Sequence, residues 1–251
     1  MSEQPVYDRI GRGYAAQRRA DPRWASAIRA AVGDARNVLN VGAGAGSYEP
    51  ADLDVIALDP STTMLAQRPT GAAPSVAAIA EAIPFRDEHF DVSTCLLTIH
   101  HWTDWRGGLA EVKRVTHQRI VIVTADIFDE DATFWPKEYF PAIAAWDREH
   151  MQPIDDLLSA LWPARVDVLP VPSDCTDGFC GAFWRRPEAY LDPDVRAAIS
   201  GFSLIPSEAV QHGLRQLSDD LQSGAWHERY GRLLDLDEMD IGIRLIVAER
   251  P

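Results

Sequence analysis

Three glycines and one aspartate stand out by their type and their spacing. Gly42, Gly44 and Gly46 follow a short apolar run, and Asp59 closes a second apolar run, Val55–Leu58. Glycine tolerates positive φ and lets the backbone come close to a ligand. A carboxylate after the second strand can accept hydrogen bonds from both hydroxyls of a ribose. These glycines read G-x-G-x-G, whereas a dinucleotide site has its third glycine further along, where it lets a pyrophosphate pass. The spacing in this sequence therefore favours a nucleoside without phosphates.

Two adjacent histidines, His100 and His101, follow the apolar run Phe90–Leu97. Ligands of open α/β sheets bind at the carboxyl ends of the strands, where these imidazoles are expected. A histidine near its ordinary pKa can take a proton at neutral pH. We therefore expect one of the two to act as a catalytic base or to position an acceptor. The alternative is that both only pack and cap the chain there.

A metal site is a competing use of nearby side chains. The candidate ligands are His100, His101 and Asp104, or the acidic run Asp126, Asp129 and Asp131. Adjacent histidines point in different directions, and no third ligand recurs at a helical spacing. We expect no metal.

Alternating strands and helices must position these residues. Strands are predicted at Val38–Val41, Val55–Leu58, Ser75–Ala78, Phe90–Leu97, Ile120–Thr124, Val166–Leu169 and Ile243–Val247. Helices are predicted from Asp21-Pro22 to Gly33, after Ser61, over Gly108–Val115 and over Ile154–Leu161. This order predicts an α/β fold with a doubly wound, mostly parallel, seven-stranded sheet. Pro50 limits any helix after the glycines to a turn or two.

Composition excludes several classes of protein. The net charge of −14 has the wrong sign for a nucleic-acid partner, and the sequence has no apolar run long enough to span a membrane. Three cysteines form neither a disulfide framework nor a metal motif, and the N-terminus has no signal-peptide pattern. We expect a cytoplasmic protein with reduced thiols and a small-molecule substrate. The oligomeric state stays open.

Four segments, in order and at characteristic spacing, carry a resemblance to a known family. They read VLNVGAGAG, VIALDPSTTML (55–65), AEAIPFRDEHFDV (80–92) and LLTIHHWTDW (96–105). Over residues 36–125 the chain resembles the class I S-adenosylmethionine-dependent methyltransferases, in particular the small-molecule branch called type 11. The resemblance implies a Rossmann-like methyltransferase fold with a helical cap insertion and S-adenosyl-L-methionine as cofactor. It implies methyl transfer to a small organic acceptor by in-line displacement, with oxygen or nitrogen favoured and carbon possible.

The resemblance also assigns cofactor contacts. It gives the methionine end to Gly42, Ala43, Gly44 and Gly46, the ribose to Asp59, the adenine side to Pro60, Ala80 and Glu81, the sulfonium to Leu96 and Leu97, and a lid over the cofactor to Tyr14 and Arg18. The segments expected are residues 1–36 as N-terminal lid and helix, 37–125 as S-adenosylmethionine-binding core, 126–171 as cap segment with the sixth strand, 172–238 as helical substrate cap and 239–251 as final strand.

Two positions depart from the family pattern. Asn40 stands where the family usually has an acid that orients the glycine loop, and it keeps an acceptor without the charge. Ile79 stands where an acid usually binds adenine, so packing, backbone or a water must hold that ring. These departures motivate an alternative function, a methyltransferase-fold protein that binds the cofactor but catalyses a non-methylating reaction such as a cyclisation. A third hypothesis is that the protein is a noncatalytic partner subunit.

The cap supplies candidates for acceptor binding. Small polar groups mixed with aromatics suit an aromatic or heterocyclic acceptor. The candidates are Tyr139, His150, Asp174 and Trp184. The alternative is that they form the core of the cap.

Overall fold

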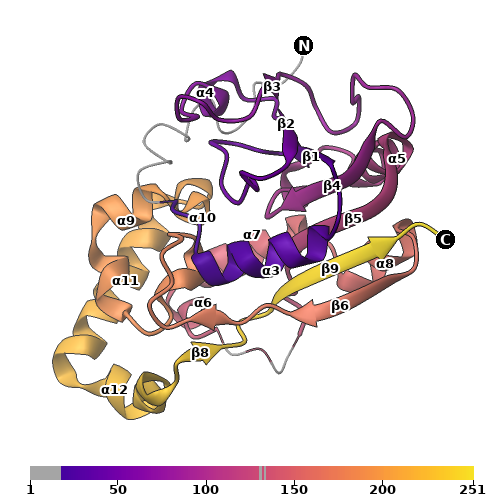
Figure 1. Ribbon diagram of the computed structural model, residues 1–251. Coiled ribbons are helices and arrows are strands. Elements are labelled where there is room, and N and C mark those ends of the chain that lie inside the picture. The colour runs from indigo at the N-terminus through magenta and orange to yellow at the C-terminus, as the bar shows by residue number, and fades with distance from the viewer. Residues whose placement is uncertain (1–17, 130–131, 133) are drawn as a thin grey trace.

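A computed structural model describes residues 18–129, 132 and 134–251. Its centre is a seven-stranded sheet in the order β3-β2-β1-β4-β5-β9-β6 (Figure 1). The strands are β1 (Asn37–Val41), β2 (Asp54–Leu58), β3 (Ser75–Val76), β4 (Phe90–Leu96), β5 (Thr116–Ala125), β6 (Ala164–Val168) and β9 (Ile243–Glu249). The strands β1 to β5 are parallel to one another, and β9 runs antiparallel to both β5 and β6. The predicted mostly parallel, seven-stranded sheet is confirmed.

Helices cover both faces of this sheet (Figure 1). On one face lies α3 (Pro22–Val32), with Trp24, Ile28 and Val32 buried against the inward residues of the strands. The other face is covered by α5 (Trp105–Val115) and α8 (Ile154–Ala160), which share a second apolar cluster. The α3 helix begins as its sequence predicts, because the Asp21 side chain accepts a hydrogen bond from the Arg23 amide. A short helix, α4 (Thr62–Leu65), is capped in the same way by Ser61.

The connection from β1 to β2 differs from the prediction. We expected a helix of a turn or two after the glycines, but residues 42–53 form only turns, a bend and irregular chain before β2. Gly46 has φ of 95° and Tyr48 has φ of 63°, and such left-handed residues interrupt a right-handed helix. The glycine loop is therefore shaped by turns and side-chain contacts.

A cap of helices packs beside the sheet (Figure 1). Its α-helices are α6 (Pro136–Tyr139), α7 (Pro141–His150), α9 (Pro193–Ala197), α10 (Ser200–Leu204), α11 (Ser207–Ser223) and α12 (Ala225–Tyr230). Short 3-10 turns, η1 (Ile99–His101), η2 (Cys180–Phe183), η3 (Pro187–Leu191) and η4 (Gly231–Asp235), and a two-stranded ribbon, β7 (Val171–Pro172) with β8 (Glu238–Met239), complete the chain.

Aromatic rings hold the cap together and join it to the sheet. Trp135 makes edge-to-face contacts with Tyr190 and Trp226, in both cases with ring centroids 5.4 Å apart. Trp24 of α3 contacts Phe179 of the cap at 5.0 Å. These residues belong to one continuous apolar cluster with the strands, so cap and sheet share a core. In the described part of the chain, no helix is long and apolar enough to span a membrane.

Candidate functional site

A cavity of about 470 Å³ lies where β1, β2 and β4 reach their carboxyl ends. The chain order changes direction between β1 and β4, which is where open α/β sheets bind ligands. The sequence-predicted residues that line the cavity are Arg18, Asn40, Gly42, Ala43, Gly44, Asp59, Pro60, Ala80, Glu81, Leu96, Leu97, His100, His101 and His150. Gly46 lies instead on a neighbouring surface groove, and Tyr14 lies outside the described residues.

Gly42 turns the chain where β1 ends. Its φ is 72°, and a Cβ at this position would lie 1.9 Å from the Thr98 hydroxyl oxygen. The amides of Gly42 and Ala43 both donate to the Leu58 carbonyl, at 2.8 and 3.0 Å. A side chain at residue 42 is therefore excluded by both backbone conformation and space.

Asp59 ties the glycine loop to the turn after β2. Its carboxylate is 8% exposed and accepts hydrogen bonds from the amides of Gly44 and Ser61, each at 2.8 Å. An ionised carboxylate offers about four acceptor sites, and Asp59 is also one of the residues that line the cavity. Asp59 thus combines a structural role in the loop with the ability to accept hydrogen bonds from a ligand in the cavity.

Behind the glycine loop lies a buried ion pair that sequence reasoning missed. Arg68 donates to both oxygens of Glu49, at 2.8 and 2.6 Å, and both side chains are at most 10% exposed. The Asn40 amide donates to the same Glu49 carboxylate at 3.0 Å. A carboxylate from nine residues later in the chain is therefore bound directly to Asn40. An acid next to Pro50 was visible in the sequence, but no local pattern indicated its pairing.

Ile79 and Ala80 contribute apolar side chains to the lining of the cavity. Ile79 is 50% exposed and lines the cavity beside Ala80, which is buried. The Glu81 carboxylate accepts a hydrogen bond from the Asp104 amide at 3.0 Å, so it holds the turn that begins α5. A flat ring in this part of the cavity would contact aliphatic carbon, as the replacement of an acid by Ile79 led us to expect.

Arg18 lines the cavity and is tied to the cap. Its Nε donates to Asp177 Oδ1 at 2.5 Å and its Nη2 donates to Oδ2 at 3.3 Å. The Tyr48 hydroxyl donates to Asp177 Oδ2 at 2.9 Å, and Asp177 is fully buried. Sequence analysis identified Arg18 but missed both of these partners, which come from distant segments.

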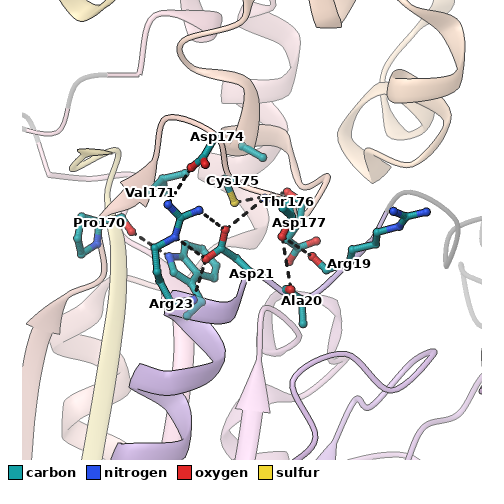
Figure 2. Close-up of polar contacts among 12 residues, drawn as sticks. Arg19, Ala20, Asp21, Arg23, Pro170, Val171, Asp174, Cys175, Thr176 and Asp177 are labelled. Carbon is teal, nitrogen blue, oxygen red and sulfur yellow. Dashed lines mark hydrogen bonds and ion pairs between the residues drawn. The ribbon is translucent and has the colours of Figure 1, made fainter. Parts of the chain in front are cut away.

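Further polar contacts hold the start of α3 against the same cap loop, as Figure 2 shows. Arg23 donates to Asp21 at 2.7 Å and to Asp174 at 2.8 Å, and the Thr176 amide donates to Asp21 at 3.3 Å. The contacts at Asp177 and at Asp21 together fix the edge of the cavity that residues 18–24 form.

The two histidines form a close pair at the rim of the cavity. The ring centroids of His100 and His101 are 3.9 Å apart, and both residues belong to η1 directly after β4. Burial lowers the pKa of His101 to about 4 and lowers the pKa of His100 well below its ordinary value. His100 Nδ1 is buried and has no hydrogen-bond partner among the described residues. Both imidazoles are neutral at pH 7.

A second, smaller cavity of about 150 Å³ adjoins the first. The residues that line both cavities are Arg18, Leu97, His100, His101 and Trp146. Leu97 directly follows β4 with φ of 53°, a conformation that is uncommon for a residue with a branched side chain. The end of β4 and the histidine pair therefore separate a large cavity from a small one.

Three of the four expected acceptor residues lie elsewhere. Tyr139 is 1% exposed and donates to Asp220 at 2.7 Å, and Trp184 is fully buried and donates to the Val171 carbonyl at 3.0 Å. Asp174 is exposed and pairs with Arg23. The structure brings none of these three to either cavity, because packing and surface pairing already engage them. His150 does line the large cavity, stacked on Trp146 with ring centroids 4.0 Å apart.

The acidic run Asp126, Asp129 and Asp131, a candidate metal site in the sequence, is only partly covered by the described residues. Asp129 pairs with Arg244, and Asp131 lies outside the described residues. Within the ranges that the structure describes, no three histidine, cysteine or acidic side chains gather in an arrangement able to hold a metal ion.

Known proteins match the sequence and the fold of this chain. The profile of a family described as Methyltransferase domain matches residues 39–123, which contain the glycine loop, Asp59 and the histidine pair. A crystal structure from Anabaena variabilis, of a protein proposed to be a methyltransferase of an antibiotic biosynthesis pathway, is 31% identical with a TM-score of 0.86. The match covers 91% of this chain and 97% of that one.

Curated relatives match over shorter stretches. The demethylmenaquinone methyltransferase of Renibacterium salmoninarum is 35% identical over 122 residues, which are 45% of this chain and 51% of that protein. An uncharacterized methyltransferase of Bacillus subtilis is 33% identical over 92 residues, 32% of this chain and 36% of that protein. The chain thus spans about half of the first relative and about a third of the second. The match along nearly the whole Anabaena structure, with the family profile on the strands that build the cavity, shows that this chain belongs to the class I S-adenosylmethionine-dependent methyltransferases.

Proposed function

We propose that this protein transfers the methyl group of S-adenosyl-L-methionine to a small organic acceptor. The observation that carries the proposal is the pair of adjoining cavities that meet at Leu97 and the two histidines. The larger has the glycine loop and Asp59 of a nucleoside site. The smaller has the size of a compact organic molecule.

The residues of the large cavity fit the cofactor. A volume of about 470 Å³ lies in the range of small-molecule sites. Asp59 would accept hydrogen bonds from the ribose, and Ile79 with Ala80 would contact adenine. The backbone at Gly42 and Gly44 would face the methionine end, with Arg18 at the same edge of the cavity. Asn40 and Glu49 act from behind the loop by fixing its conformation.

When bound, the cofactor supplies a methyl group on a positively charged sulfur, a leaving group that needs no protonation. The work of the chain is therefore alignment and exclusion of water. Leu96 and Leu97 line the cavity where β4 ends, and Trp146 closes the boundary to the small cavity. These side chains would hold an acceptor in a dry, fixed position.

The histidine pair serves this step best as a positioning element. An imidazole with a pKa near 4 is a weak base at neutral pH, which disfavours strong proton abstraction by His101. Neutral imidazoles can still donate and accept hydrogen bonds, and His100 Nδ1 has that capacity unused among the described residues. We propose that His100 contacts the acceptor directly and that His101 packs against it to fix its ring.

Two measurements test this function. Calorimetry with S-adenosylhomocysteine should show one binding site per chain. Incubation with methyl-labelled S-adenosylmethionine and a panel of small hydroxyl, amine and carbon acceptors should place the label in a product identified by mass spectrometry. Cofactor binding followed by an unlabelled, rearranged product would instead support the non-methylating alternative that the Asn40 and Ile79 departures motivated. Absence of cofactor binding would contradict the proposal altogether.

A further inference from the structure

Asp147 is a half-buried carboxylate that lines the small cavity, and among the described residues the charges that act on it, Lys137 and His150, do so from beyond ion-pair distance. It lies on α7, one residue after Trp146, and lines the same wall. Among the described residues its carboxylate accepts no hydrogen bond and makes no ion pair within 4.0 Å. Taking a carboxylate out of water is costly unless it is hydrogen-bonded or paired. The missing partner therefore suggests a ligand.

Lys137 of α6 lines the same cavity but does not fill this role. No ion pair joins Lys137 to Asp147. The Lys137 ammonium lies instead over the Phe134 ring, 5.9 Å from its centroid, where the ring face attracts a cation. Arg18, the other cation of this cavity, is engaged by Asp177. Lys137 therefore acts on the Asp147 carboxylate only from a distance and gives it no hydrogen bond, so a hydrogen-bond donor for this carboxylate is still missing among the described residues.

The walls of the small cavity suit a compact ring. Aromatic side chains of Phe134, Trp146 and Phe179 line it, together with aliphatic residues that include Ile143 and Ile199. A cavity of about 150 Å³ is the size that holds a single benzene ring in a protein interior. A larger fused-ring molecule would not fit without movement of the cap.

Electrostatics in the cavity favour a cationic group on that ring. Aromatic faces attract ammonium groups, and the two neutral imidazoles at the boundary do not repel them. The two cations of the cavity are engaged elsewhere, Arg18 by Asp177 and Lys137 by the Phe134 ring. Burial raises the pKa of Asp147 to about 6, so its ionised form at neutral pH sits in a poor solvent for charge. An ammonium group at hydrogen-bond distance would compensate that cost.

We propose that the small cavity is the acceptor site and that Asp147 anchors a single-ring acceptor through an amino group. The acceptor role rests on the proposed methyl transfer. The anchoring role rests on the unpaired carboxylate and the aromatic walls alone. Binding can therefore be tested without turnover.

The test uses three probes of equal size on the full chain at pH 8. Benzylamine, benzyl alcohol and benzoate are titrated by calorimetry, each with and without saturating S-adenosylhomocysteine. We expect benzylamine to bind at least tenfold more tightly than the neutral and the anionic probe. Equal affinities, or no binding of any probe while S-adenosylhomocysteine binds, would overturn this inference and leave the proposed function intact.

Matched variants locate the preference. Asp147→Asn keeps the size of the side chain and should weaken benzylamine binding at least tenfold, with S-adenosylhomocysteine affinity changed less than twofold. Glu149→Gln removes an equal charge from the exposed side of the same helix and should leave both affinities unchanged. Unchanged benzylamine affinity in Asp147→Asn would overturn the assignment. Benzylamine binding that depends on Asp147, in a protein that does not bind S-adenosylhomocysteine, would support the anchoring role and refute the proposed function. The comparison of three probes on the wild-type protein decides the matter even if a variant does not fold.

Discussion

Asp59→Asn separates the two roles that the structure gives to this residue. In the wild type, the carboxylate accepts the amides of Gly44 and Ser61, each at 2.8 Å. Asparagine offers a single oxygen, so one of these amides loses its acceptor and faces an NH₂ group instead. Leaving one partly buried amide without an acceptor costs roughly 1–3 kcal/mol. We expect the free energy of unfolding of the unliganded protein to fall by about that amount.

Cofactor affinity should fall further, because the ribose loses a charged acceptor while the glycine loop loosens. A hydrogen bond to a charged group contributes about 1.5–3 kcal/mol, so with some loop rearrangement the total loss is roughly 2–4 kcal/mol. This corresponds to about a 30- to 1,000-fold increase in Kd for S-adenosylhomocysteine. Calorimetry gives the Kd, and urea unfolding of the unliganded protein gives the stability.

A matched control is Asp54→Asn, which removes the same charge from an exposed position at the other end of β2 and should change neither quantity. An Asp59→Asn variant that is less stable but binds S-adenosylhomocysteine within twofold of wild type would refute a ligand contact for Asp59. It would leave that residue a purely structural role.

The remaining predictions concern stability. Arg68→Met leaves Glu49 buried without its ion-pair partner and should lower the free energy of unfolding by about 3–5 kcal/mol in urea, whereas Arg36→Met, at an exposed position, should change it little. Burial lowers the pKa of His101 from 6.5 to about 4, so the folded state resists the proton that the unfolded state takes up. The free energy of unfolding should be highest above pH 6.5 and fall by up to about 3 kcal/mol as the pH drops toward 4. Urea unfolding midpoints of His101→Gln should depend less steeply on pH than those of the wild type. Burial raises the pKa of Asp147 from 3.8 to about 6, so the ionised carboxylate destabilises the folded state above pH 6. Asp147→Asn should therefore be about 1–3 kcal/mol more stable than wild type at pH 8, with no gain below pH 4. A variant that is less stable than wild type at pH 8 would contradict the unpaired carboxylate.

Local chemistry made much of the sheet predictable. Asp21 and Ser61 cap the helices that follow them, as their side-chain types and positions predicted. The apolar runs became the buried strands because a doubly covered parallel sheet needs no polar face. Gly42 and Asp59 line one cavity because the carboxyl ends of neighbouring parallel strands meet at the same edge.

What the sequence did not predict depends on contacts between distant segments. Asp177 meets Arg18 from 159 residues away and Tyr48 from 129 residues away, and no periodicity encodes such pairs. Glu49 meets Arg68 from 19 residues away, and it does so in a loop after β1 that forms turns instead of the expected helix.

The roles of residues in the cap were difficult to predict for a related reason. Tyr139 and Trp184 have side chains equally suited to bind an acceptor or to pack a core, and packing decided their places. The same reasoning passed over Asp147, because a single acid on an amphipathic helix resembles an ordinary exposed residue until its neighbours are known.

A crystal structure of the protein grown with S-adenosylhomocysteine tests the central claim most directly. The account predicts electron density for the nucleoside along Gly42–Gly44, with the ribose hydroxyls within hydrogen-bond distance of Asp59 and the sulfur facing the small cavity near Leu97. Density elsewhere on the surface, or a large cavity closed by the protein's own side chains in the presence of saturating ligand, would contradict it.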